Sequence, residues 1–394
     1  MHLYIHIPFC NQKCRYCDFV SGVYSRGYQE DYIRALTREL ESVFENVEPR
    51  AITTLYIGGG TPSSLAPEAL IQIYETLERH MDLSSLEEFT VEANPESVTF
   101  DFALLAAANG VNRISLGVQS ANADELEFLG RIHSFEQVEE AVKLFRKVGI
   151  HNINMDLIFA LPDQSLKNLS YSLKRFAEIE PEHISCYSLI FEEGTALTKL
   201  LDLGMISEID EDYYVKQYRY IIDYLQDKGY QQYEISNFAK KGYESKHNSS
   251  YWSGDDYIGV GTAAHSKIGN KRFSNVSDIE EYIQRFLNSD GFLQAIDEES
   301  IEFLDAKDVY NELIFLGLRR SRGIDLSDLT KHIDALKYSS SFSNFLDIDE
   351  VHLTVYRAIK QLVEDGLLHI TDKKISLTQR GREISNTVFT KLMI

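Results

Sequence analysis

The stretch that decides the fold of this chain is YIHIPFCNQKCRYC, residues 4–17. It begins with a short apolar run that is typical of a buried strand. Three cysteines, Cys10, Cys14 and Cys17, follow within eight residues, whereas Cys186 stands alone. Clustered thiols in a chain without export features indicate metal binding or catalysis rather than disulfides. We therefore expect a reactive site in the loop that follows the first strand.

Composition narrows the class of protein before any motif is considered. The 394 residues carry 39 Lys+Arg and 61 Asp+Glu, a formal net charge of −22. This length predicts two or three domains. The acidic balance argues against nucleic acid as the main partner, because phosphate binding needs concentrated basic surface. No signal peptide and no apolar run long enough to span a membrane is evident, so we expect a cytoplasmic protein.

The first half of the chain alternates short apolar runs with helix-period stretches. The expected strands are 2–7, 52–58, 88–93, 112–118, 151–158 and 183–189, and the expected helices are 28–45, 66–80, 100–109, 121–147 and 165–178. This alternation predicts an α/β fold with a parallel sheet and right-handed crossovers. Six such units favour a partial (β/α)6 barrel over residues 1–190, with an open flavodoxin-like sheet as the alternative.

The remainder of the chain predicts two further units. Residues 191–295 form an irregular α/β extension, with a tyrosine-rich helix over 210–228, a short strand near 232–235 and a loop-rich stretch to about 275. Its tyrosine stripe, which includes Tyr214 and Tyr218, predicts core packing with polar tips. Residues 296–394 follow the order of a winged-helix-like α+β domain, with expected helices at 306–319, 325–333, 349–366 and 380–392 and strands at 367–370 and 374–377.

The spacing of the three cysteines favours an iron–sulfur cluster over a structural zinc site. A structural zinc site needs four ligands, usually from two pairs, and no second pair follows Cys17. Three thiolates around a cubane cluster leave one iron open to a small molecule. The CxxxCxxC spacing, with Tyr16 just before the third cysteine, resembles the radical S-adenosylmethionine (SAM) superfamily.

That resemblance implies the cofactors and their location. Cys10, Cys14 and Cys17 would hold a [4Fe-4S] cluster in the loop after the first strand of a partial (β/α)6 barrel. SAM would bind the open iron, and an electron from the cluster would cleave it to a deoxyadenosyl radical. The protein supplies binding and orientation for this chemistry, and Tyr16 would belong to the same cofactor site.

Polar residues also mark the ends of the later strands. The run Gly58–Pro62 follows the second strand, and Glu92, Gln119 and Asp156 end the third, fourth and fifth strands. In barrels of parallel strands, sites are built at the carboxyl ends of the strands. We expect these residues to share one rim with the cysteines.

The order of these motifs resembles the family of oxygen-independent coproporphyrinogen III oxidases (HemN) and heme chaperones (HemW). The resemblance covers nearly the whole chain, including the C-terminal domain. It implies that one group of residues contacts SAM: Tyr4, Gly59, Gly60, Thr61, Glu92, Gln119, Arg131 and Asp156.

Three features favour the chaperone branch of that family. The oxidases carry another cysteine two residues after the third, where this chain has Phe19, and they carry an N-terminal extension before the cluster motif. Residues 247–252, HNSSYW, match the HNxxYW motif of the chaperones. His247 is thereby a candidate heme-binding residue, since neutral imidazole is a common axial ligand. His265 lies in another family-like stretch and receives no role.

The expected function is therefore heme binding and delivery to heme-dependent respiratory proteins. Further hypotheses are peripheral membrane association and a homodimer, with no nucleic-acid partner. The alternative is an oxidase that decarboxylates coproporphyrinogen III to protoporphyrinogen IX, so the sequence leaves enzymatic activity open. A third alternative is a winged-helix regulator that senses iron or redox state, which the mixed charge of residues 350–364 disfavours.

Overall fold

The computed structural model describes residues 1–288, 291–339 and 347–394. The six expected parallel strands are present, and each begins and ends within two residues of its expected position. They are β1 (His2–Ile7), β2 (Thr54–Gly59), β3 (Glu88–Ala93), β4 (Arg113–Gln119), β5 (Asn152–Phe159) and β6 (His183–Ser188). Neighbouring strands pair in parallel from β1 to β6 in sequence order. This arrangement confirms the expected mixed α/β fold.

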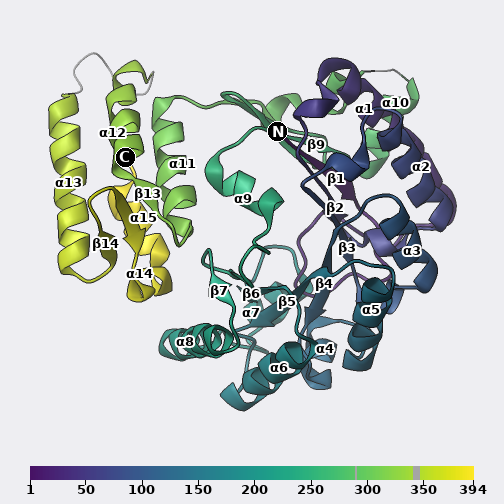
Figure 1. The fold of residues 1–394 in the computed structure, drawn as a ribbon, viewed down its shortest axis with the longest axis horizontal. Helices are drawn as coiled ribbons and strands as arrows, with labels where there is room; N and C mark the ends of the chain where they lie inside the picture. Colours follow the sequence, from purple (N-terminus) through teal and green to yellow (C-terminus); the bar gives the residue numbers. More distant parts are fainter. Residues whose placement is uncertain (289–290, 340–346) are drawn as a thin grey trace.

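Helices cover the outer face of the curved sheet (Figure 1). They are α1 (Arg26–Asn46), α2 (Pro67–Glu78), α3 (Phe100–Ala108), α4 (Ala123–Leu129), α5 (Phe135–Lys147) and α6 (Leu166–Ile179). The single stretch expected over 121–147 is two helices, because Gly130 adopts a left-handed conformation (φ 75°) and ends α4. Ser134 then begins α5 with a capping box.

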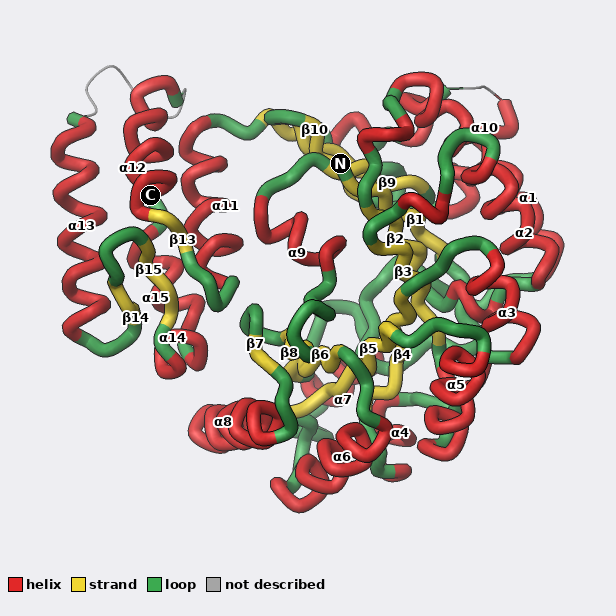
Figure 2. The backbone as a smooth tube through the Cα atoms, viewed as in Figure 1, coloured by secondary structure: helices red, strands yellow, loops and turns green. Residues whose placement is uncertain are grey.

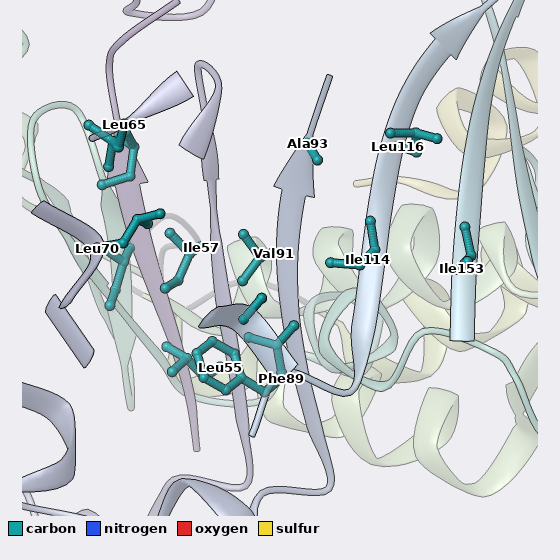
Figure 3. Close-up of a cluster of buried hydrophobic side chains, with 14 of the residues drawn as sticks. Leu55, Ile57, Leu65, Leu70, Phe89, Val91, Ala93, Ile114, Leu116 and Ile153 are labelled. Carbon is teal, nitrogen blue, oxygen red and sulfur yellow. The ribbon is translucent and has the colours of Figure 1, made fainter. Parts of the chain in front are cut away.

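Strand alternation separates the core from the barrel interior. Leu55, Ile57 and Val91 are fully buried in the main hydrophobic core (Figure 3). The intervening positions, including Tyr56 and Glu92, lie on the opposite face of the sheet. At these positions the interior face carries polar and aromatic side chains, whereas the outer face carries apolar ones, Phe89 included, so the interior is available for a site.

The central sheet extends beyond the six expected strands on both sides. Its full order is β12-β11-β10-β9-β1-β2-β3-β4-β5-β6-β8-β7, and Figure 2 shows the strands as one curved band. The added strands are β7 (Gln231–Gln232), β8 (Asn237–Ala239), β9 (Tyr257–Val260), β10 (His265–Ile268), β11 (Lys271–Ser274) and β12 (Glu302–Phe303). Much of the stretch expected to be loop-rich up to 275 is therefore strand, and residues 246–253 form helix α9 (Lys246–Ser253).

Three further helices complete this part of the chain: α7 (Ala196–Asp202), α8 (Glu211–Asp227) and α10 (Ile279–Asn288). Of the tyrosines named for α8, Tyr218 is buried in the main core and Tyr214 is partly buried against it, as expected for core packing. Single-turn 3-10 helices lie at Pro49–Ala51, Pro62–Ser64, Leu83–Ser85, Pro95–Ser97, Phe292–Ala295, Glu298–Ser300 and Leu336–Tyr338.

The C-terminal residues form a separate domain around a second core (Figure 1). Its elements are α11 (Ala306–Arg319), β13 (Ile324–Asp325), α12 (Leu326–Ala335), α13 (Ile348–Glu364), β14 (Leu368–Ile370), β15 (Lys374–Leu377), α14 (Gln379–Glu383) and α15 (Ser385–Leu392). Tyr310, Ile314 and Leu362 are fully buried in this core. The expected order of helices and hairpin is present, with one additional two-residue strand, β13, paired to β15.

Helix α9 lies between the central sheet and the C-terminal domain (Figure 1). The guanidinium of Arg319, at the end of α11, lies 4.5 Å from the ring centre of Trp252. Arg319 also donates from Nε to Glu234 at 2.6 Å, and the Glu234 side chain is fully buried. Trp252, the last residue of the HNxxYW motif, therefore contacts the second domain. In the described parts of the chain no helix is long and apolar enough to cross a membrane.

Candidate functional site

The cysteine loop is fixed by backbone hydrogen bonds at both ends. The Cys10 amide donates to the Gly22 carbonyl and the Gly22 amide donates to the Pro8 carbonyl, both at 2.9 Å. The Arg15 amide reaches the Leu129 carbonyl at 3.0 Å. All three loop cysteines are half-buried free thiols, whereas Cys186 is buried within β6. The loop thus presents its thiols at the carboxyl end of β1, as expected.

Two residues from other parts of the chain donate hydrogen bonds to the sulfurs, one just after β2 and one just after α4. Thr61, just after β2, donates from Oγ1 to Cys10 Sγ at 3.5 Å. Arg131 donates from Nη1 to Cys14 Sγ at 3.4 Å, and its Nη2 lies 2.7 Å from Asn94 Oδ1. Hydrogen bonds to sulfur tune the potential of iron–sulfur clusters. The rim thus brings together three cysteines with donors suited to thiolates.

The glycines at the end of β2 are required because neighbouring atoms of residues 6–9 lie too close to leave room for a side chain. A Cβ on Gly60 would lie 2.7 Å from the Phe9 carbonyl oxygen and 2.8 Å from that of Ile7. The Gly60 amide donates to the Ile7 carbonyl at 2.7 Å. Gly59 has φ +108°, and a Cβ there would lie 2.4 Å from the His6 ring. Gly60 thus lets β2 lie against the base of the cysteine loop.

Two carboxyl groups from the central strands lie inside the barrel: Glu92 is next to last in β3, whereas Asp156, expected at the end of its strand, lies within β5, three residues before Phe159. Glu92 accepts a hydrogen bond from Tyr56 Oη at 2.6 Å and another from the Gly59 amide at 3.0 Å. Burial raises the pKa of Glu92 to about 7. Burial likewise raises the pKa of Asp156, to which Asn154 Nδ2 donates at 2.7 Å. Raised carboxyl pKa values in a cleft are typical of functional sites.

Gln119 stands out at the end of β4 because its backbone is left-handed, with φ 68°. The pairing of β4 with β5 shifts register between Gly117 and Gln119. A positive φ in a non-glycine residue stores strain, and such residues cluster at active sites and ligand clamps. This geometry places Gln119 at the same rim as Glu92 and Asp156.

Two adjoining pockets open beside this rim. The first has a volume of about 210 Å³ and is lined by Tyr4, Phe19, Tyr56, Gly59, Glu92, His247, Asn248 and Tyr251. The second has a volume of about 390 Å³ and is lined by Tyr4, His6, Asp18, Phe19, Val20, Tyr251, Tyr257, Ala263, Ala264 and His265. They share Tyr4, Phe19 and Tyr251, so one aromatic wall serves both.

His247 lies on α9, and the side chain of Glu88, at the start of β3, accepts hydrogen bonds from the first amides of this helix. Glu88 accepts hydrogen bonds from the Lys246 amide at 2.8 Å and the His247 amide at 3.0 Å. The His247 ring is 1% exposed, and its nitrogens pair with Thr54 Oγ1 at 2.8 Å and Tyr251 Oη at 3.0 Å. Burial lowers the pKa of His247 to about 3, so the ring is uncharged.

Sequence reasoning missed the partners of these residues. Tyr56 and Thr54 face the interior through strand alternation, a signal that the β2 sequence does carry. Tyr251 lies four residues after His247, and this spacing places two side chains on one face only once the segment is known to be helical. The expectation of a loop over this segment does not predict the pair, because residues four apart share a face only in a helix.

The donor set fits the expected cofactors. Among the described residues, no three His, Cys, Asp or Glu side chains are gathered tightly enough to hold one metal ion. An iron–sulfur cluster is a larger body than one ion, and three free thiols on one loop suit it. A bound cluster would supply electron transfer to SAM, and this chain's residues hold the loop and shape the adjoining pockets.

Comparisons with known proteins agree with this geometry. Residues 4–175 match the Radical SAM superfamily, and residues 304–384 match the HemN C-terminal domain. The superfamily match implies a [4Fe-4S] cluster and SAM as cofactors. Among solved structures, coproporphyrinogen III oxidase (HemN) from Escherichia coli aligns with a TM-score of 0.80 and 22% identity, covering 100% of this chain and 89% of its own. That likeness shows the fold.

Curated relatives show the family. The heme chaperone HemW of Lactococcus lactis subsp. lactis (strain IL1403) is 34% identical over 391 residues, which cover 99% of this chain and 97% of that protein. The heme chaperone HemW of Bacillus subtilis (strain 168) is 35% identical over 392 residues, covering 98% and 97% respectively. The cysteine loop, the rim of polar strand ends and the two-domain architecture therefore have one common explanation: the chain belongs to the HemW family of the radical SAM superfamily.

Proposed function

We propose that this protein is a heme chaperone, which binds heme beside its iron–sulfur cluster and passes it to heme-dependent respiratory proteins. The observation that carries the proposal is the pair of adjoining pockets next to the cysteine loop. Their shared wall of Tyr4, Phe19 and Tyr251 offers aromatic surface to a flat macrocycle. Relatives that match nearly the whole chain bear the name heme chaperone HemW.

Phe19 supports the chaperone over the oxidase. It occupies the position at which the oxidase branch carries a fourth cysteine, and its side chain is 60% exposed in the wall of both pockets. An exposed aromatic residue can stack on a porphyrin, whereas it cannot ligate iron. Peripheral membrane association during delivery, a cytoplasmic location and a homodimer belong to this proposal as expectations.

The site residues serve three ligands in this proposal, and Tyr4 belongs both to the SAM set and to the wall of the heme pocket. Cys10, Cys14 and Cys17 hold the cluster. The residues assigned to SAM are Tyr4, Tyr16, Gly59, Gly60, Thr61, Glu92, Gln119, Arg131 and Asp156. Within this set, Thr61 and Arg131 contact cysteine sulfurs, and Gly60 packs against the loop. His247 contributes to the wall of the heme pocket, where its hydrogen bond orients Tyr251.

One experiment tests the proposal against the oxidase. The full chain is reconstituted anaerobically with iron and sulfide, and is then titrated with heme and, in parallel, incubated with coproporphyrinogen III, SAM and a reductant. Stoichiometric heme binding without porphyrinogen decarboxylation supports the chaperone. Decarboxylation with release of deoxyadenosine, and no retained heme, would replace the chaperone with the oxidase. Transfer from the loaded protein to an apo-cytochrome then tests delivery.

A further inference from the structure

Three histidines line the two pockets, and their hydrogen bonding distinguishes them. His6 pairs through Nδ1 with Tyr4 Oη at 3.0 Å and through Nε2 with the Val20 carbonyl at 2.9 Å. His247 also has both ring nitrogens engaged, as described above. The His265 ring makes no hydrogen bond to any side chain or backbone atom among the described residues, and its side chain is exposed at the second pocket. A free ring nitrogen is what an iron ligand requires.

The backbone before His265 is braced from several sides. The Gly261 amide donates to Glu39 Oε2 at 2.8 Å, and the Thr262 amide donates to Tyr32 Oη at 3.1 Å. Ala263, between them and His265, has φ 55°. Glu39 and Tyr32 both come from α1, which packs on the outer face of the barrel. This tight turn between β9 and β10 therefore has a defined conformation, and it sets where the imidazole projects.

The surroundings of His265 suit a flat apolar ligand. Tyr257 packs edge-on against Tyr251 with ring centres 4.7 Å apart at 83°. Phe19 forms another wall of the same pocket. Aromatic faces beside a single imidazole are a suitable environment for a metalloporphyrin, because the faces contact the macrocycle and the nitrogen reaches the metal.

We infer that His265, at the mouth of the second pocket, supplies the axial nitrogen ligand to heme iron. This inference rests on the proposed heme-binding function and deepens it. His247 then acts as a positioning residue, because its hydrogen bond holds Tyr251 in the aromatic wall. If the buried His247 ring turned toward iron, Thr54 or Tyr251 would lose its hydrogen-bond partner, which costs free energy. An exposed ligand also suits a chaperone, since heme bound at the pocket mouth is accessible to an acceptor.

The test uses the full-length, cluster-reconstituted protein and ferric heme as the probe. Heme affinity and the Soret absorption are measured for wild type, His265→Ala and a matched control, His151→Ala, which removes an exposed histidine remote from both pockets. We expect His265→Ala to bind heme roughly tenfold or more weakly with a shifted Soret band. Added imidazole should restore the wild-type spectrum. SAM binding by the same variant is measured in parallel.

The outcomes separate this inference from the function on which it rests. If the wild type binds no heme, the proposed chaperone function fails. If the wild type binds heme and His265→Ala keeps both its affinity and its spectrum, the function stands and the ligand assignment is wrong. A loss of SAM affinity with unchanged heme spectra would likewise overturn the assignment. Weaker heme binding that added imidazole does not restore would show that His265 only packs against heme. That result would also contradict iron ligation by His265.

Discussion

Arg131 donates from Nη1 to Cys14 Sγ at 3.4 Å, while its Nη2 lies 2.6 Å from the Gly117 carbonyl oxygen in β4. One planar guanidinium thus links the middle cysteine of the loop to a central strand of the sheet. The link spans 117 residues of sequence, so the loop position depends on long-range structure as well as on the local cysteine spacing. We therefore expect a change at Arg131 to alter the surroundings of Cys14.

Arg131→Lys should leave the cluster assembled but lower its midpoint potential, because lysine cannot supply the same fork of donors. Hydrogen bonds to cluster sulfurs raise the potential by stabilising the reduced state. The measurement is a redox titration followed by electron paramagnetic resonance. The matched control is Arg15→Lys in the same loop, since Arg15 is exposed and bonds a carbonyl rather than a sulfur. An unchanged potential in Arg131→Lys would contradict the assignment.

Cys14→Ser should abolish the iron–sulfur cluster while the barrel stays folded, because apolar burial dominates the stability of the sheet and its helices. Iron content, visible absorption and far-ultraviolet circular dichroism test the two parts separately. Cys186→Ser is the control: this cysteine lies buried in β6, away from the loop, and its variant should retain iron. An unfolded Cys14→Ser protein would show that the fold itself needs the cluster.

Gly60→Ala should displace the cysteine loop, because the new Cβ would clash with two carbonyl oxygens of Ile7 and Phe9. The expected cost is roughly 1–3 kcal/mol of stability, together with reduced cluster occupancy after reconstitution. Thermal unfolding and iron analysis measure both effects. Gly27→Ala, at the start of α1 with no atom within 4 Å of the added Cβ, should be tolerated. Equal behaviour of the two variants would refute the packing argument.

Glu39 predicts a pH-dependent contribution to stability. It is fully buried, accepts hydrogen bonds from Gly261, Asn275 and Tyr282, and burial raises its pKa from 4.5 to about 7. A raised carboxyl pKa means that its stabilising contribution is complete below pH 4.5 and is lost as the pH rises through 7.

The stability of wild type relative to Glu39→Gln should therefore decline between pH 5 and pH 8, by up to about 3 kcal/mol. Denaturant unfolding at both pH values, with the exposed Glu30→Gln as control, measures this difference. A relative stability that rises with pH would show that the hydrogen bonds, rather than burial, dominate the pKa of Glu39.

Arg319→Met should destabilise the contact between α9 and the C-terminal domain, because it leaves the buried Glu234 carboxylate without its cation. The expected cost is about 2–3 kcal/mol, less than for a fully buried pair, since Arg319 retains some exposure. The double variant Arg319→Met/Glu234→Gln should recover part of this loss. Denaturant unfolding and limited proteolysis between the domains provide the measurement, and additive losses in the double variant would contradict a coupled pair.

The sequence predicted β1 to β6 closely because each strand is a run of buried apolar residues, such as Leu55 and Ile57, bounded by clear turns. It could not predict β9 to β11, which are four residues each: β9 pairs with the edge of β1, β10 pairs with β9, and β11 pairs with β10. Local propensity is weak over such lengths, and tertiary pairing decides the outcome.

The same limit applies to the candidate site. The position of Glu92 near the carboxyl end of β3 follows from strand order, and the cysteines follow from their spacing, whereas Asp156 lies within β5 because that strand continues to Phe159. The placement of His247 required α9 to be a helix begun by Glu88, which is 159 residues earlier in the chain. No local pattern encodes that contact, and so the hydrogen bonds that occupy both nitrogens of His247 could be seen only in the structure.

The position of β1 has a consequence for synthesis. It is synthesised about 250 residues before β9, residues 257–260, yet it pairs with β2 on one side and with β9 on the other. The strand that leads into the cysteine loop therefore lacks one neighbour until residues 257–260 have been made. Because long-range pairing forms slowly, we expect the cysteine loop to reach its final shape late in folding. Cofactor insertion would then follow completion of the barrel.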